Sequence, residues 1–209
     1  MENLDNIAEK IRQDFLAQDA AREKAMPLGR EVIRYCGNAI RAVHRQEFDQ
    51  ALDMLKTARQ LLDDQEKALA SGTELHNTGF LRDAQKEYAE GCITLALIKG
   101  DKLPDPDTLG TEYSAYLNGM GEAVGELRRY LLDGLRKGDL ARGEGLLQAM
   151  DDIYNTLVTI DFPDAITGGL RRTTDMVRGV LERTRSDLTL TIQQKVLEDK
   201  LDRFQEKLK

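Results

Sequence analysis

Tryptophan is absent from this sequence of 209 residues, and proline, cysteine and histidine number only 4, 2 and 2. Hydrophobic residues make up 41% of the chain and charged residues 32%. That balance fits a helical protein with a sizeable core and argues against disorder. Cys36 and Cys92 show neither metal-ligand nor redox spacing, and we interpret them as buried free thiols.

Long apolar runs are also missing. No stretch approaches the length that crosses a bilayer, and the first residues carry neither a basic segment nor an apolar core of the kind found in signal peptides. We therefore expect a cytoplasmic protein without a membrane segment. The sequence also lacks a P-loop, a glycine-rich phosphate loop, a Ser-His-Asp pattern and a zinc signature.

The net charge is −7, so a nucleic-acid surface would have to be a local basic stripe. One candidate stripe consists of four arginines that fall within roughly 60° of one another on a helical wheel: Arg30, Arg34, Arg41 and Arg45. A row of guanidinium groups suits phosphate recognition, although a solvated or salt-bridged helix face gives the same pattern. His44 lies beside this row in sequence.

Apolar residues recur every three or four positions along most of the chain, which predicts an all-α fold in one domain over residues 1–209. Pro27 is expected either to kink the first helix or to open a second one. The helical segments that we expect are Leu4–Arg45, Phe48–Leu69 with a stop at Ser71–Gly72, Thr73–Lys99, Tyr113–Gly138, Leu140–Ile160 capped by Asp139, a helix opened by Thr167–Gly169, and Leu188–Leu208.

The segment Tyr113–Arg129 carries an unusual combination of glycines and like charges. Glu122 and Glu126 lie four residues apart and share a helix face, where like charges repel unless a cation lies between them. The same segment contains Gly119, Gly121 and Gly125, each of which weakens a helix interior by about 1 kcal/mol. Such glycines are useful where another helix or a ligand approaches closely.

A second acidic pair, Glu87 and Glu90, lies on the preceding predicted helix. The short linker Asp101–Asp107 favours antiparallel packing of the two helices, which could bring the two pairs face to face. Oxygen ligands alone favour Mg²⁺ or Mn²⁺ over Zn²⁺. Because the expected Glu-x-x-His pairs are missing, a di-iron centre is disfavoured. The alternative for each pair is a solvated helix face.

Three motifs resemble the Translin/Trax family: Gln85–Gly91, Tyr116–Arg129 and Leu170–Asp175. The helix that carries Arg30, Arg34 and Arg41–Arg45 is similar to the basic N-terminal helices of that family. The resemblance covers nearly the whole chain. It implies an all-α subunit of about seven helices in an antiparallel bundle that assembles into a hollow homo-octamer enclosing nucleic acid.

The Trax branch of this family implies a metal-dependent endoribonuclease with four acidic residues. Matched motif by motif, these catalytic and metal-binding positions are Glu87, Glu90, Glu122 and Glu126. Trax has aspartate where Glu122 stands, and the extra methylene could displace a metal ligand by about 1 Å. The resemblance further implies RNA as the partner, or single-stranded DNA. It implies a nucleic-acid contact through the basic residues Arg30, Arg34, Arg41, His44 and Arg45.

Our preferred interpretation is an endoribonuclease that uses Mg²⁺ or Mn²⁺ to cut single-stranded or loosely structured RNA inside a homo-oligomeric shell. The first alternative is a non-catalytic Translin-type protein that binds single-stranded RNA or DNA, with structural carboxylates. The second is a helical scaffold protein that binds partners through the apolar stripe of its last helix, Leu188–Leu208. It would leave the glycines and the like-charge pairs unexplained.

Overall fold

The computed structural model describes residues 2–70 and 79–208, and within these ranges it contains helices and no strand. The all-α prediction is therefore confirmed. Six long helices and two single turns follow one another as α1 (Glu2–His44), α2 (Phe48–Leu69), α3 (Gly79–Lys99), α4 (Pro106–Leu109), α5 (Tyr113–Leu135), α6 (Leu140–Val158), α7 (Asp164–Thr167) and α8 (Leu170–Leu208).

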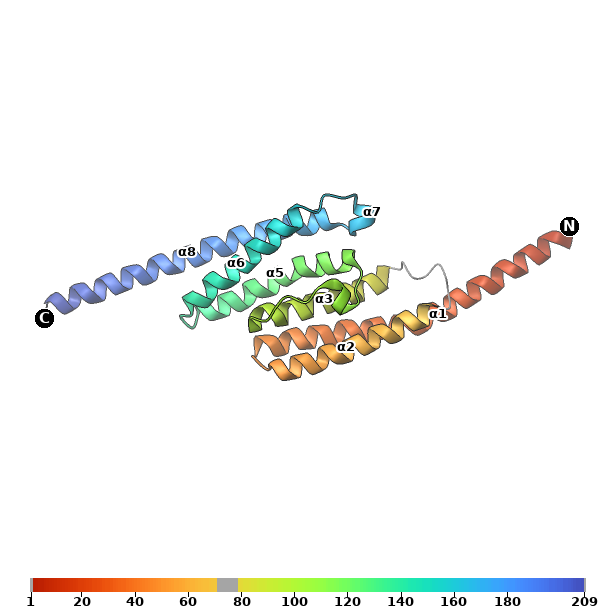
Figure 1. Ribbon diagram of the computed structural model, residues 1–209, viewed down its shortest axis with the longest axis horizontal. Helices are drawn as coiled ribbons and strands as arrows, with labels where there is room; N and C mark the ends of the chain where they lie inside the picture. The colour runs from red at the N-terminus through yellow and green to blue at the C-terminus, as the bar shows by residue number, and fades with distance from the viewer. Residues whose placement is uncertain (1, 71–78, 209) are drawn as a thin grey trace.

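The helices form an elongated antiparallel bundle in which α3 and α5 lie in the middle (Figure 1). α1 and α2 pack together on one side, α6 and α8 pack on the other, and α3 contacts α1 as well as α5. The N-terminal part of α1 and the C-terminal part of α8 project beyond the bundle in opposite directions (Figure 1). In the part of the chain that the structure describes, no helix combines the length and apolarity that a bilayer-spanning segment needs.

Local sequence explains most of the helix boundaries. Asp139 accepts a hydrogen bond from the backbone N–H of Arg142 at 3.1 Å, which confirms it as the cap of α6. Asp105 caps α4 in the same way, so the predicted linker contains the start of a short helix. Gly168 and Gly169 adopt positive φ angles of 64° and 88° and separate α7 from α8.

Helix continuity differs from the sequence expectation in two places. Pro27 does not open a second helix: α1 continues through it, because buried side chains on both sides, Ala25 and Val32, hold the helix against the bundle. The expected last two helices form the single helix α8, since no glycine or proline occurs between Gly179 and its end. The expected stop at Ser71–Gly72 and start at Thr73 lie outside the described residues.

Gly119 is where α5 comes closest to α3. A Cβ atom there would lie 2.6 Å from the carbonyl oxygen of Lys86 and 3.0 Å from the backbone nitrogen of Glu90, so any side chain would force the two helices apart. Gly121 faces α8 in the same way, and a Cβ atom there would collide with Thr173. Gly125 differs, because a Cβ atom there would meet nothing within 4 Å in this chain.

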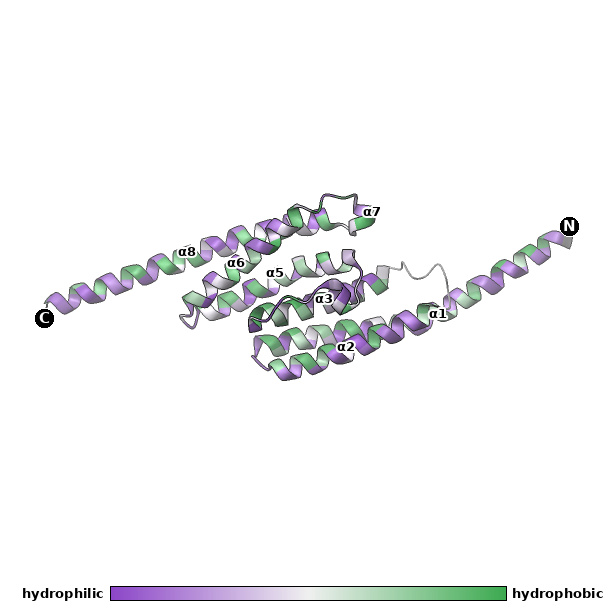
Figure 2. Cartoon of the chain, in the orientation of Figure 1, coloured by the Kyte–Doolittle hydropathy of each residue, from purple (hydrophilic) through white to green (hydrophobic). Residues whose placement is uncertain are grey.

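The two projecting segments keep an apolar stripe that the bundle does not cover (Figure 2). Large apolar side chains on them are between 47% and 72% exposed: Leu4, Ile7, Ile11 and Phe15 on α1, and Leu190, Leu197, Leu201, Phe204 and Leu208 on α8. Cys36 is a buried free thiol as expected, whereas Cys92, also free, is only partly buried.

Candidate metal centre

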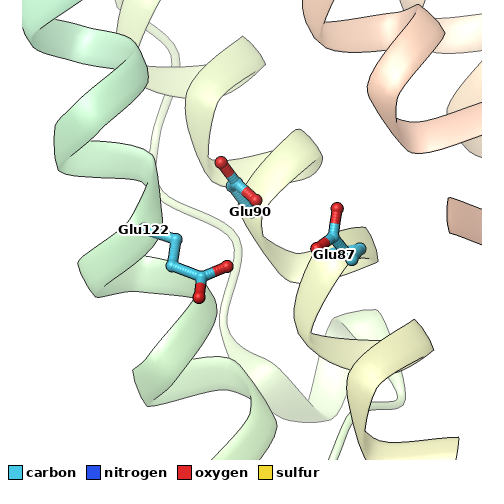
Figure 3. A group of neighbouring side chains, drawn as sticks. All are labelled: Glu87, Glu90 and Glu122. Atoms are coloured by element: carbon cyan, nitrogen blue, oxygen red, sulfur yellow. The ribbon is translucent and has the colours of Figure 1, made fainter. Parts of the chain in front are cut away.

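Three glutamates from the two central helices converge at one place. Figure 3 shows Glu122 reaching from α5 toward the turn of α3 that carries Glu87 and Glu90. One carboxylate oxygen from each of the three lies within 4.8 Å of the others. The facing arrangement expected from the short linker is therefore present for these three residues. We call them the acidic cluster.

Burial makes the charges of this cluster unfavourable unless a cation compensates them. Glu90 is only 9% exposed, and its pKa is raised to about 8, first by burial and then by the charges of Glu87, Glu122 and Glu126. Burial, followed by the charge of Glu122, also raises the pKa of Glu87. Near neutral pH and without a bound cation, Glu90 is therefore mostly protonated.

One cation already lies at the cluster. The ammonium group of Lys86 is 2.7 Å from a carboxylate oxygen of Glu122. Burial alone would lower the pKa of Lys86, but the hydrogen bond and charge of Glu122 outweigh it and raise that pKa. Sequence reasoning missed Lys86, although it precedes Glu90 by four residues and so shares its helix face.

Glu126 lies one turn further along α5 and has a different partner. Its carboxylate is 2.5 Å from Nε2 of His44, at the end of α1. This hydrogen bond lowers the pKa of Glu126, against the opposing effect of burial and with help from the charges of His44 and Arg129. Glu126 is not one of the three converging carboxylates, but its charge reaches Glu90 and contributes to the raised pKa there.

His44 is thus placed beside the carboxylates and not along the exposed arginine row. Its side chain is only 7% exposed, and its Nδ1 atom is buried without a hydrogen-bond partner among the described residues. Its imidazole lies 6.1 Å from the ring of Tyr130, measured between centroids. The end of α1, just beyond Arg41, therefore contacts Glu126, which lies one turn along α5 from Glu122 of the acidic cluster.

The donor set of the acidic cluster fits a hard divalent cation. All three groups offer carboxylate oxygen, which suits Mg²⁺ or Mn²⁺ better than metals that prefer nitrogen or sulfur. The three carboxylate oxygens lie within 4.8 Å of one another, so side-chain movement that brings them closer together would let them hold one such ion.

The four arginines of the predicted stripe lie on the exposed face of α1 and just beyond its end. Arg34 pairs with Glu31 and Arg45 with Glu47, while Arg41 donates a hydrogen bond to Asn38. Arg30 makes no ion pair or hydrogen bond within residues 2–70 and 79–208. Part of the stripe is thus engaged in short-range pairs with water-exposed partners, which a phosphate group can replace.

Comparison with known proteins supports a family assignment. No family model matches the chain. The chain is 32% identical over 199 residues to Uncharacterized protein MJ0175 of Methanocaldococcus jannaschii, covering 92% of this chain and 86% of that protein.

Among solved structures, the fold is similar to that of AfC3PO in complex with duplex RNA, with a TM-score of 0.81 and 32% identity over 90% of this chain and 98% of that one. It is also similar to the crystal structure of AfC3PO alone, with a TM-score of 0.82, 33% identity and the same coverage. Apo-NeC3PO shares the fold at 20% identity, with a TM-score of 0.75, over 91% of this chain and 98% of its own.

These similarities cover nearly the whole chain. The C3PO structures are of the Translin/Trax type, in agreement with the motifs of the sequence that resemble this family. The chain belongs to the Translin/Trax family.

Proposed function

We propose that this protein is a metal-dependent endoribonuclease that cuts single-stranded or loosely structured RNA inside a homo-oligomeric shell. The observation that carries the proposal is the acidic cluster. Three carboxylates with hard-cation chemistry converge from two helices, and burial together with the charges of the neighbouring carboxylates raises the pKa of Glu90. Side chains whose pKa is shifted by burial and by specific charged neighbours are typical of functional sites.

In this proposal Glu87, Glu90 and Glu122 hold one Mg²⁺ or Mn²⁺ ion. The ion, when bound, lowers the pKa of a water ligand and offsets negative charge on a phosphoryl oxygen. Glu126, fourth in the acidic set, orients the attacking water. The hydrogen bond from His44 suits this role, because it fixes the Glu126 carboxylate and keeps it ionised as a hydrogen-bond acceptor.

The arginine stripe on α1 supplies affinity for the RNA backbone. Contacts of this kind are largely independent of sequence and weaken as salt is added. The structure of AfC3PO has been solved in complex with duplex RNA, and the similar fold of the present chain supports a nucleic-acid ligand for it as well. Because the whole molecule carries a net charge of −7, an acidic exterior around a basic lining would reconcile the charge with RNA binding.

The projecting segments of α1 and α8 support the proposed assembly into a homo-oligomer. Their apolar stripes cannot reach the bundle of their own chain, so burial requires another chain. Copies of the same protein supply matching stripes at matching positions, and the octamer implied by the family is the closed arrangement that we propose.

The direct test is cleavage of a labelled single-stranded RNA by purified protein with Mg²⁺, with Mn²⁺ and with a chelator. We expect metal-dependent cutting that Glu90→Gln and Glu122→Gln abolish. The matched control is Glu144→Gln, which removes an exposed carboxylate on α6 and leaves cutting unchanged. Cutting that persists in the chelator, or at wild-type rate in Glu90→Gln, would contradict the proposal.

The Lys86–Glu122 ion pair favours one alternative, a non-catalytic Translin-type protein that binds single-stranded RNA or DNA. Here Lys86 is the permanent partner of the cluster, and no metal is needed. Tight, salt-sensitive RNA binding without cutting in any metal would establish this alternative.

A further inference from the structure

A cavity of about 430 Å³ lies beside the acidic cluster, between α3, α5 and the start of α8. Glu122 belongs to the cluster and also lines this cavity, so the two features are continuous. The cavity wall carries three cationic side chains, Arg82, Lys86 and Arg172. None of the three belongs to the arginine stripe on α1.

Two of these cations have no anionic partner in the part of the chain that the structure describes. Arg82 extends from α3 to the turn before α8, where a Cβ atom on Gly168 would lie 3.5 Å from its Nη1 atom. Arg172, in the first turn of α8, also makes no ion pair among residues 2–70 and 79–208. Three other arginines of the same helix do pair with carboxylates, whereas Arg183 and Arg203 also make no ion pair in the described ranges: Arg171 pairs with Asp161, Arg178 with Asp175, and Arg185 with Asp151.

The wall that presents Arg172 is held in place by Asn118 of α5. The Nδ2 atom of Asn118 donates to the carbonyl oxygen of Thr167 at 2.8 Å, and its Oδ1 atom accepts from the hydroxyl of Thr173 at 2.6 Å. These bonds tie the α7–α8 turn to α5. The cavity is therefore preformed, and a ligand would lose little free energy in ordering it.

The charge balance of the cavity selects an anion. Of its two carboxylates, Glu122 is paired with Lys86, which leaves Asp83 against the two unpaired guanidinium groups. The N-terminus of the long helix α8 adds positive potential at the same wall through the helix dipole. Guanidinium groups match the oxygens of a phosphate better than other cations do.

We propose that this cavity is a subsite for a phosphodiester group of the RNA strand, next to the phosphodiester positioned at the acidic cluster. This inference rests on the proposed function. Arg82 and Arg172 contact the phosphate oxygens, and the strand passes along α5 from this cavity to the carboxylates. An internal phosphodiester is the fitting occupant because the cavity opens onto the cluster through Glu122. The subsite fixes which phosphodiester reaches the carboxylates.

The test is binding of a labelled single-stranded RNA in the presence of chelator, where no cutting interferes, over a range of salt concentrations. Arg82→Gln and Arg172→Gln are each expected to weaken binding about tenfold at low salt and to reduce the slope of log K against log salt by about 0.7. Arg82→Lys and Arg172→Lys should keep most of the slope, because the charge remains. Arg183→Gln is the matched control, an exposed arginine of α8 away from the cavity.

The outcomes separate the two proposals. If the wild-type protein binds no RNA, the proposed function fails. If the wild-type protein binds RNA and the cavity variants bind as Arg183→Gln does, only the subsite is overturned. RNAs with a 5′-phosphate and with a 5′-hydroxyl are compared in parallel: equal losses support an internal phosphodiester. A loss confined to the 5′-phosphorylated RNA would overturn that assignment, since the cavity would then bind the strand end.

Discussion

Replacing Glu90 by glutamine should stabilise the metal-free protein, by an amount that grows as the pH rises from about 4.5 to about 8. The folded protein holds a proton on Glu90 up to a pKa of about 8, whereas the ordinary value is 4.5. Between these two values the folded state binds more protons than the unfolded state, so the free energy of unfolding falls as the pH rises. Glutamine resembles the protonated acid in shape and cannot ionise, so the free energy of unfolding of the variant does not fall in this way as the pH rises.

The size of the effect follows from the shift. Each pKa unit corresponds to about 1.4 kcal/mol, so the rise at Glu90 amounts to roughly 4–5 kcal/mol once the pH exceeds 8. For a chain of this length, 1 kcal/mol changes the melting temperature by about 2–4 °C. We therefore expect Glu90→Gln to melt at about the wild-type temperature at pH 5, and roughly 10 °C higher at pH 8.5.

The assay is thermal unfolding, followed by circular dichroism from pH 5 to pH 9, of wild type, Glu90→Gln and the exposed control Glu144→Gln. Mn²⁺ should raise the melting temperature of wild type and leave that of Glu90→Gln nearly unchanged, because the variant lacks a metal ligand. A melting curve of Glu90→Gln that follows wild type at every pH would refute the account of a buried, uncompensated carboxylate.

Three further results are expected. Gly119→Ala should lower the free energy of unfolding by about 2–3 kcal/mol in a urea titration, because its Cβ would press on the backbone of α3. Gly125→Ala, whose Cβ lies in open space, should raise that free energy by up to about 1 kcal/mol, and equal effects of the two changes would contradict the packing. His44→Gln should raise the pKa of Glu126, because the hydrogen bond from His44 lowers it, and so move the acidic limb of the pH–rate profile for RNA cutting to higher pH. An acidic limb that does not move would contradict a role for ionised Glu126 in cutting. Arg41→Glu should weaken RNA binding and reduce its salt dependence at every RNA sequence tested, as judged by fluorescence anisotropy; a sequence-dependent loss would contradict a backbone contact.

Periodicity in the sequence predicted most of the long helices but neither the continuity of α8 nor the short helices α4 and α7. It also predicted the convergence of Glu87, Glu90 and Glu122, because spacing on one helix and a short linker fix which faces can meet. The partners of the carboxylates were beyond its reach. Lys86 binds across to α5, and His44 reaches Glu126 from a helix 82 positions away in sequence. Such contacts depend on how three helices pack, which no local pattern encodes.

The glycines show the same limit in a different way. Gly119 and Gly121 mark close helix contacts, as their cost to a helix interior suggested, while Gly125 has free space around it in the single chain. Pro27 was expected to kink α1 or to open a second helix, and α1 continues through it because tertiary packing on both sides outweighs the lost hydrogen bond. Local propensity predicts where a helix is weakened, and packing decides whether it ends there.

Metal binding by the acidic cluster can be seen directly in an anomalous difference map from crystals of the protein soaked in Mn²⁺. We predict a peak between the carboxylates of Glu87, Glu90 and Glu122, with the ammonium group of Lys86 displaced from Glu122. An empty cluster at saturating Mn²⁺, with Lys86 still bound to Glu122, would contradict it and leave a binding protein whose carboxylates are structural.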